Sequence, residues 1–460
     1  MFKPSGFKPS GRKLSCLLMA VCAAGSLSAQ QPSGLKEVMD RLDRLEAQNR
    51  DLMAEIRALR SQLLAAGQPA GETVVQTPEE QAAAPPIAER VETAERRLAD
   101  LDQSKISSDH RLPVTLTGML LFNAFLNGKG VAGADNPTIL PPAGGQASGG
   151  ATFRQSVIGL KLNGPDIIGG GKVTGAIYMD FFGGGTGLNQ TMRLRVSTLD
   201  ATWKNTTLGL AFDKPIIAPR EPDSLAQVGV SPLTAAGNLW LWQPQVRVEH
   251  RVALTDRAGL RAQFGVYQTS ESGTGLSTDY PDLARSRPGY QGRFEFWGQS
   301  GSRRIEIAPG FHVSSTRVIG QSVPSRIFSI DWLIRPAARV DFTGTFFHGE
   351  NTGVIGGLRQ GVSVLNGRAH SVEATGGWAQ FTFRATRRAS LNFYGGQEDD
   401  RNRDLDRGGI GKNQGYGANI MYRLGSNILT SFEASQVRTT YLGSGTRISP
   451  HYDLAFAYLF

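Results

Sequence analysis

The sequence predicts an all-β transmembrane antiparallel barrel of about 16 strands, preceded by an N-terminal α-helical coiled coil. Three observations predict this fold: an unbroken heptad repeat near the N-terminus, a change to two-residue periodicity from Val114, and a last strand with aromatic residues at alternate positions. The chain has 460 residues, of which 56 are Gly, and only 19% of its residues are charged. This composition suits many strands and turns better than a helix-rich enzyme.

Residues 1–29 have the features of a cleaved signal peptide for secretion. Basic residues at positions 3, 8, 12 and 13 precede an apolar run over 14–24, and small residues then provide a cleavage site after Ala29. Cleavage after Ser26 or Ser28 is an alternative. Both cysteines, Cys16 and Cys22, lie inside this segment, so the mature chain is expected to have no disulfide and no thiolate metal site.

Residues 30–66 are predicted to form the coiled coil. Apolar side chains occupy the a positions 35, 42, 56 and 63 and the d positions 38, 45, 52 and 59, and Asn49 is the one polar a residue, which can fix the register. A lone amphipathic helix folded back onto another domain is the alternative. A flexible linker over 67–86 and a short helix over 87–111 follow. Residues 30–111 carry 11 basic and 15 acidic side chains, so this arm is acidic and the following region is basic.

From residue 112 to residue 460 the pattern predicts the barrel. Apolar residues alternate with polar or small ones, as expected when one face of a strand meets lipid and the other meets the lumen. No apolar run outside the signal is long enough for a helical span. Long connections alternate with short ones, and an even strand number places both chain ends in the periplasm. The predicted strands are 114–126, 152–162, 172–182, 192–204, 206–212, 243–253, 258–268, 289–298, 304–315, 326–335, 338–348, 372–385, 388–396, 414–424, 427–438 and 450–460.

The last strand resembles the C-terminal sorting signal of outer-membrane barrels. Tyr452, Leu454, Phe456, Tyr458 and Phe460 occupy alternate positions, and Tyr458 and Phe460 form the end of the signal. The alternative is a soluble β-domain that ends in an edge strand, but an exposed aromatic edge strand promotes aggregation in water. We therefore expect the protein in the outer membrane, delivered by the barrel assembly machinery, with the coiled coil in the periplasm.

Charged side chains at lumen-facing positions are the candidate functional residues. Arginines there would raise the local concentration of anions in a narrow aqueous pore. The alternative is that they pair with acidic lumen residues such as Asp180, Asp331, Asp341 and Glu433 and have only a structural role. The predicted pore-lining residues are Arg193, Arg195, Arg247, Glu249, Arg251, Arg261, Arg293 and Glu295.

The long connection over 213–242 is a candidate constriction loop, since in general porins a loop at this place folds into the pore. Trp240 and Trp242 would then fix the loop where it returns to the wall. The alternative is that the loop folds outward. The residues predicted to line the constriction are Lys214, Arg220, Glu221 and Asp223.

No motif predicts catalysis, a cofactor or nucleic-acid binding. None of the six histidines has metal-ligand spacing, and no nucleophile elbow is present. The acidic run over 398–406 lacks the central glycine and closing glutamate of a calcium loop, so we interpret it as a solvated external loop, with weak cation bridging to lipopolysaccharide as the lesser alternative. We expect a protein that is not an enzyme and has no cofactor or metal.

Several short motifs resemble the DcaP-like porins, a family of trimeric outer-membrane channels with an N-terminal coiled-coil extension. The resemblance is carried by the heptads and by motifs between residues 150 and 250: Phe153-Arg154-Gln155-Ser156 with Gly159-Leu160, Asp180-Phe181-Phe182-Gly183, Met192-Arg193-Leu194-Arg195 and Gln243-Pro244-Gln245-Val246-Arg247. It implies a 16-stranded barrel, a homotrimer, and passage of small negatively charged solutes such as dicarboxylates.

The sequence therefore predicts a porin for passive diffusion of small hydrophilic, preferentially anionic solutes. Expected partners are outer-membrane lipid and lipopolysaccharide, with peptidoglycan as a further candidate. One alternative is a structural barrel anchor that tethers the outer membrane to peptidoglycan through the coiled coil. A barrel enzyme is another, less favoured alternative.

Overall fold

The computed structural model describes residues 113–131, 134–184, 190–269 and 287–460. The predicted signal peptide (1–29), coiled coil (30–66), linker (67–86) and short helix (87–111) all lie outside these residues. Within the described ranges, no helix is both long enough and apolar enough to cross a membrane.

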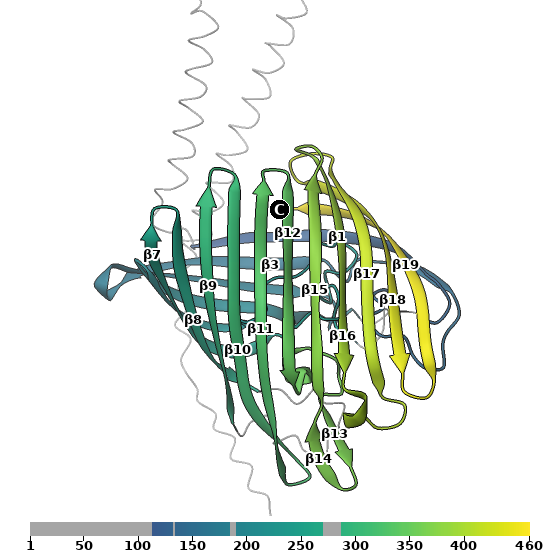
Figure 1. Cartoon of the computed structure of the whole chain (residues 1–460). Coiled ribbons are helices and arrows are strands. Elements are labelled where there is room, and N and C mark those ends of the chain that lie inside the picture. The colour runs from purple at the N-terminus through teal and green to yellow at the C-terminus, as the bar shows by residue number, and fades with distance from the viewer. Residues whose placement is uncertain (1–112, 132–133, 185–189, 270–286) are drawn as a thin grey trace, which may run out of the picture. The chain divides into compact units, whose positions relative to one another are not determined.

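The described chain forms one closed antiparallel sheet (Figure 1). Consecutive strands pair with one another, and β1 closes the sheet by pairing with β19 on one side and with β2 and β3 on the other. The strands are β1 (Val114–Asn127), β2 (Ser148–Thr152), β3 (Val157–Ile167), β4 (Gly171–Asp180), β5 (Arg193–Trp203), β6 (Thr206–Asp213), β7 (Gln243–Thr255), β8 (Ala258–Gln268), β9 (Pro288–Ser300), β10 (Arg303–Val318), β11 (Gln321–Ala337), β12 (Val340–Glu350), β15 (Glu373–Arg384), β16 (Ala389–Asp400), β17 (Ile410–Arg423), β18 (Ile428–Tyr441) and β19 (Gly445–Leu459).

β2 and β3 share one position in the barrel, because both pair with β1 and only residues 153–156 separate them. The barrel therefore has 16 strand positions, which confirms the predicted number. The pieces outside the sheet are short: the 3-10 turns η1 (Ile168–Gly170), η3 (Thr352–Ile355) and η4 (Asn402–Asp404), and a separate hairpin of β13 (Val362–Leu365) and β14 (Arg368–Ser371).

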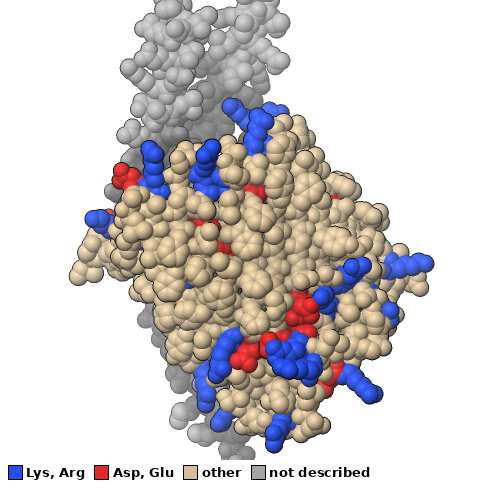
Figure 2. Space-filling view, in the orientation of Figure 1, with Lys and Arg blue, Asp and Glu red and all other residues tan. Residues whose placement is uncertain are grey.

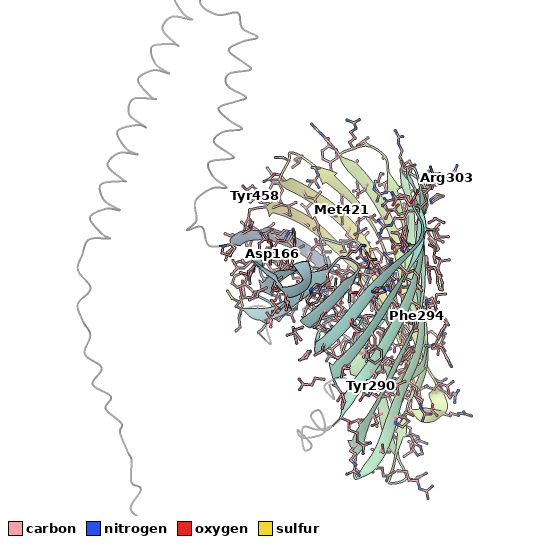
Figure 3. All side chains as sticks on the ribbon, turned by 90° about the vertical axis from the view of Figure 1, so that its left-hand side faces the viewer. Asp166, Tyr290, Phe294, Arg303, Met421 and Tyr458 are labelled. Carbon is pink, nitrogen blue, oxygen red and sulfur yellow. The ribbon has the colours of Figure 1, made fainter. Side chains whose placement is uncertain are left out.

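The outer face of the wall is apolar and the inner face is polar. Along β9, Phe294 and Phe296 are 43% and 54% exposed, whereas Glu295 between them is 4% exposed. Figure 2 shows that charged residues gather mostly near the two ends of the barrel, and Figure 3 shows Phe294 on the outer side of the wall. A soluble β-sandwich has the opposite distribution, with apolar side chains inside and polar ones outside. The distribution seen here is that of a barrel wall that faces lipid.

Connections at the end of the barrel that holds the C-terminus are short, and we call this the short-turn end (Figure 1). The opposite end carries most of the long connections, including those that join β1 to β2, β6 to β7 and β12 to β15. The predicted alternation fails between β10 and β11, where Ile319 and Gly320 alone turn the chain with φ of 47° and 77°. Two consecutive positive φ angles are typical of a two-residue type I′ hairpin turn. β10 and β11 are therefore long strands that are joined directly at this end of the barrel.

The interpretation of 398–406 as a solvated loop is wrong for its first residues. Glu398 and Asp400 belong to β16, face the interior and are 0% and 2% exposed. The Glu398 carboxylate accepts hydrogen bonds from the Thr352 hydroxyl at 2.7 Å and the Leu358 backbone N–H at 2.9 Å. Strand alternation, and not local charge density, places these acidic groups against the loop that folds over them.

The C-terminal residue closes the sheet. Phe460 and Gly118 exchange two backbone hydrogen bonds, of 2.9 and 3.1 Å. The Phe460 ring also lies over Gly118, where a Cβ atom would stand 2.6 Å from the ring Cζ. Only glycine leaves room for this contact, so the join between the first and last strands is fitted around the terminal aromatic ring.

Candidate functional site

The connection 214–242, here called the inner loop, lies inside the barrel. Polar side chains from widely separated strands hold its backbone: Ser329 of β11 donates to the Ile217 carbonyl at 3.1 Å, Asn123 of β1 to Leu225 at 2.9 Å, and Asn413 of β17 to Ala235 at 2.8 Å. A segment that folded outward could not reach these inward-facing groups. The inward course that the sequence suggested is therefore the observed one.

The inner loop is anchored where it leaves β6 by an apolar cluster inside the lumen. Ile216 and Ile217 pack with Tyr267, Phe347 and Ile355, and all five are at most 4% exposed. The Ile216 backbone N–H donates to the Tyr267 hydroxyl at 2.9 Å. These contacts bury apolar surface in an otherwise polar lumen and attach the first turn of the loop to the wall.

The middle of the inner loop is held by Gln155, which is 0% exposed and lies in the break between β2 and β3. Its carboxamide oxygen accepts the backbone N–H groups of Val228 and Gly229 at 2.8 and 2.7 Å, and its nitrogen donates to the Ala226 carbonyl at 2.9 Å. The Arg195 guanidinium donates to the Val228 carbonyl at 2.6 Å. Because one residue satisfies three backbone groups, the break in the strand serves to position the loop.

The return of the inner loop is packed against arginines. Trp242 lies under the Arg193 and Arg195 guanidinium groups, at 5.2 and 5.1 Å from the ring centroid, and Trp240 meets Trp242 edge-on at 5.4 Å. Cation–π contacts of this kind are stronger when they are shielded from water. The expectation that these tryptophans fix the returning loop agrees with this geometry.

The four predicted constriction residues lie on the first half of the inner loop, and each has a partner. Arg220 donates to Asp331 at 3.0 Å and also binds Glu306. Asp223 accepts from Gln380 at 2.7 Å. Lys214 forms an ion pair with Glu221 at 2.5 Å.

Two acidic side chains of the inner loop have shifted pKa values. Burial alone would raise the pKa of Glu221, but Lys214 and the Ser231 hydroxyl lower it below its ordinary value. Withdrawal from bulk solvent raises the pKa of Asp223, although the hydrogen bond from Gln380 opposes the rise. The two carboxylates therefore differ in how readily they carry charge within one loop.

All the predicted pore-lining arginines face inward, and each pairs with a carboxylate. Arg193 and Arg195 donate to Asp180 at 2.8 and 3.1 Å, and Arg247 donates to Asp213 at 2.9 Å. The remaining pairs are Arg251 with Glu249 at 2.8 Å, Arg261 with Glu295, and Arg293 with Asp331 at 2.7 Å and Glu295 at 2.7 Å. The paired arrangement raised as an alternative is therefore present, and Arg193 and Arg195 also support the inner loop.

At the short-turn end, the arginines of these pairs are more exposed than their partners. The Arg304 side chain is 48% exposed and its partner Glu306 is 4% exposed. Arg384 and Arg335 are 38% and 31% exposed, and the Asp341 they share is 9% exposed. The guanidinium groups are therefore the more exposed member of each pair in this part of the barrel. Sequence reasoning missed Arg304, Arg335 and Arg384. A usable signal was that each occupies an inward-facing alternate position of its strand, next to a short turn.

The opposite wall carries acidic groups that hydrogen-bond neutral donors. Glu433 accepts from Ser224 and Tyr394, both at 2.6 Å, and Asp453 accepts from Asn123 at 3.0 Å. Glu433 and Asp453 thus form an acidic wall over β18–β19, whereas the wall arginines named above that pair with carboxylates lie on β5, β7 to β11 and β15. Among the described residues, no group of three or more His, Cys, Asp or Glu is arranged to hold a metal ion.

No family model and no curated protein sequence matches the chain. Solved structures do match its fold. The outer-membrane channel DcaP of Acinetobacter baumannii aligns with a TM-score of 0.63 and 15% identity, covering 75% of this chain and 97% of that one. The chain has a porin fold. The resemblance to the DcaP-like porins is thereby confirmed at the level of the fold.

Two further solved structures align with this barrel at lower TM-scores. Pseudomonas putida OprB gives a TM-score of 0.50 at 11% identity, covering 76% of this chain and 94% of that one. An anion-selective porin from Comamonas acidovorans gives 0.49 at 11% identity, covering 75% and 99%.

Proposed function

We propose that this protein is an outer-membrane porin that admits small hydrophilic solutes by passive diffusion. The observation that carries the proposal is the inner loop, which is held inside a closed barrel by polar contacts to β1, β11 and β17. Barrels of this strand number are wide enough to leave an aqueous channel, and a loop attached in this way narrows the channel without closing it. In this proposal Lys214, Arg220, Glu221 and Asp223 bound the constriction, and the protein performs no catalysis.

The proposal includes a preference for anions, with small carboxylates such as dicarboxylates as candidate solutes. Its support is the unequal exposure at the short-turn end, where Arg304 and Arg384 face the lumen and their carboxylate partners are buried. Charges near a low-dielectric wall raise the local concentration of counter-ions. The acidic wall over β18–β19 opposes this effect, so we expect a moderate preference.

The assembly we propose is a homotrimer in the outer membrane. The coiled coil over 30–66 would lie in the periplasm, and the outer surface would contact lipid and lipopolysaccharide. Tyr458 and Phe460 would act as the sorting signal for the barrel assembly machinery. Binding of peptidoglycan by the coiled coil is a further part of the proposal that a pull-down with purified cell wall would test.

The test is conductance of the purified protein in a planar bilayer under a salt gradient. We expect stepwise openings and a reversal potential that favours chloride over potassium. The double variant Arg304→Gln, Arg384→Gln should lower the chloride-to-potassium permeability ratio roughly twofold, because two exposed lumen charges are lost. In this variant Glu306 keeps Arg220 and Asp341 keeps Arg335, so neither carboxylate is left unpaired.

Arg303→Gln is the matched control, since Arg303 precedes Arg304 on the same strand and lies at the rim of the barrel in Figure 3. Equal selectivity in the double variant and the control would refute the anion preference. A correctly folded barrel without conductance would overturn the porin proposal and favour the structural anchor.

A further inference from the structure

A small cavity opens into the lumen at the short-turn end, along the ends of the four neighbouring strands β7, β8, β9 and β10. Its volume is about 210 Å³ and its walls include Arg251, Arg261, Arg304 and Trp297. None of these residues holds the inner loop. Pockets for drug-sized ligands measure roughly 300–1,000 Å³, so this cavity suits a smaller molecule.

Two carboxylates, Glu295 and Glu306, also line the cavity, and both are paired with arginines. The Glu295 side chain is 5% exposed and binds Arg261 and Arg293, and the Glu306 side chain is 4% exposed and binds Arg304 and Arg220. Glu295 therefore contacts three guanidinium groups, since Arg220 also lies 3.7 Å away, and Glu306 contacts two. An incoming anion meets little net repulsion from these acidic residues.

The arginines that line the cavity keep donors available. Arg251 is 64% exposed and hydrogen-bonds Glu249 through Nε, with no hydrogen bond from its terminal nitrogens to any described residue. Arg261 has a buried Nε without a hydrogen-bond partner in the described part of the chain. Arg304 is 48% exposed and leaves one terminal nitrogen without such a partner among the described residues. Guanidinium groups with free N–H donors bind carboxylates by short, charge-assisted hydrogen bonds.

Trp297 adds an aromatic surface to the same cavity. Its indole lies over Gly259 of the neighbouring strand β8, where a Cβ atom would stand 2.6 Å from the ring Cζ2. The glycine therefore lets the ring lie close to the wall beside the arginines. Aromatic rings stack against one another with offset or edge-to-face geometry, which favours a planar ligand.

We infer that this cavity binds a small aromatic carboxylate at the short-turn mouth of the channel. The carboxylate is held by the free N–H groups of Arg251 and Arg304, and the ring of the ligand stacks on Trp297. The cavity size limits the ligand to about one ring. This inference deepens the proposed function, and it rests on that function for the route by which the ligand enters.

The first experiment measures block of the potassium chloride current through the bilayer-reconstituted protein by sodium benzoate added to one side at a time. We expect benzoate to block at lower concentration from the side that faces the short turns, and acetate and benzamide to block more weakly than benzoate. Arg251→Gln with Arg304→Gln should weaken the block by about tenfold, the loss expected for a charge-assisted hydrogen bond. Trp297→Leu should weaken it roughly threefold to tenfold and leave acetate unaffected.

Arg303→Gln again serves as the control, because it removes an arginine next to Arg304 that does not line the cavity. Equal block by benzoate and acetate, or a block unchanged by Trp297→Leu, would show a general anion effect and overturn the inference while the porin proposal stands. Calorimetric titration of benzoate into the detergent-solubilised protein tests the site even if no current is seen. Binding lost in the arginine and tryptophan variants supports the site, and no binding to the wild-type protein refutes it.

Discussion

At the residue scale, the lumen is defined by how each guanidinium group is paired. Arg293 is 0% exposed, and it donates to Asp331 at 2.7 and 2.8 Å, to Glu295 at 2.7 Å and to Gln263 at 2.8 Å. The Arg304 side chain, by contrast, is about half exposed while it pairs with Glu306. The same residue type is therefore fully paired in the middle of the wall and keeps free N–H groups near the mouth, because burial decides which of its N–H groups remain free.

Replacing Arg293 with Met should destabilise the barrel by about 3–5 kcal/mol, since it leaves buried carboxylates without their main partner. The measurement is urea unfolding of the protein in lipid vesicles, followed by tryptophan fluorescence. Arg303→Met, at an exposed position of β10, should change the free energy of unfolding by less than about 0.5 kcal/mol. Indistinguishable unfolding of the two variants would contradict the structural role of Arg293.

At the element scale, the inner loop has no regular secondary structure of its own and depends on the wall for its path. Gln155 satisfies three of its backbone groups, and the loop reaches Asn413 and Ser329 on distant strands. Loops fixed by side chains of a rigid scaffold can hold a constriction without forming a helix or strand. The path of the inner loop therefore depends on the scaffold as much as on its own sequence.

Gln155→Leu should free the middle of the inner loop, because the N–H groups of Val228 and Gly229 lose their acceptor, at a cost of about 1–3 kcal/mol for each buried unsatisfied group. Single-channel recording should show larger current fluctuations and a higher mean conductance than the wild type. Gln414→Leu is the control, since Gln414 bonds Gln397 and does not touch the loop. If the current through Gln155→Leu fluctuates no more than that of the wild type, this side chain does not hold the loop.

At the scale of the whole molecule, the fold depends on joining the two ends of the sheet. β1 pairs with β19 over nine residues on each strand, from Met119 with Leu459 to Asn127 with His451. Closure removes the free edges that an open sheet would expose. It also brings Asn123 to 3.0 Å from Asp453, which is 330 residues away in the sequence.

Phe460→Ala should impair closure, since it removes the ring that covers Gly118. We expect a several-fold lower fraction of the folded, heat-modifiable form in the outer-membrane fraction, measured by gel mobility with and without boiling. Phe456→Ala removes another outward aromatic residue of the same strand, 46% exposed, and should have a smaller effect. Equal loss in the two variants would show that only aromatic content matters.

The sequence by itself determined the strand number, the approximate place of most strands and the face on which their side chains lie. Two-residue alternation is a local property of an extended chain, so Arg193, Arg195 and Arg293 could be placed on the inner face without knowing any partner. The short turns and the aromatic last strand are likewise local signals. The same rule would have placed Glu398 inward, had the strand been extended to its observed end.

Only the tertiary structure decided which charges remain free and where the inner loop runs. The partners of the lumen arginines come from other strands, and Arg220 reaches Asp331, 111 residues away, only because the loop turns inward. The cavity beside Trp297 exists because side chains from four neighbouring strands, β7 to β10, meet at one end of the barrel. Pairing across a closed barrel depends on register and curvature, which are properties of the whole sheet and are not encoded in any one segment.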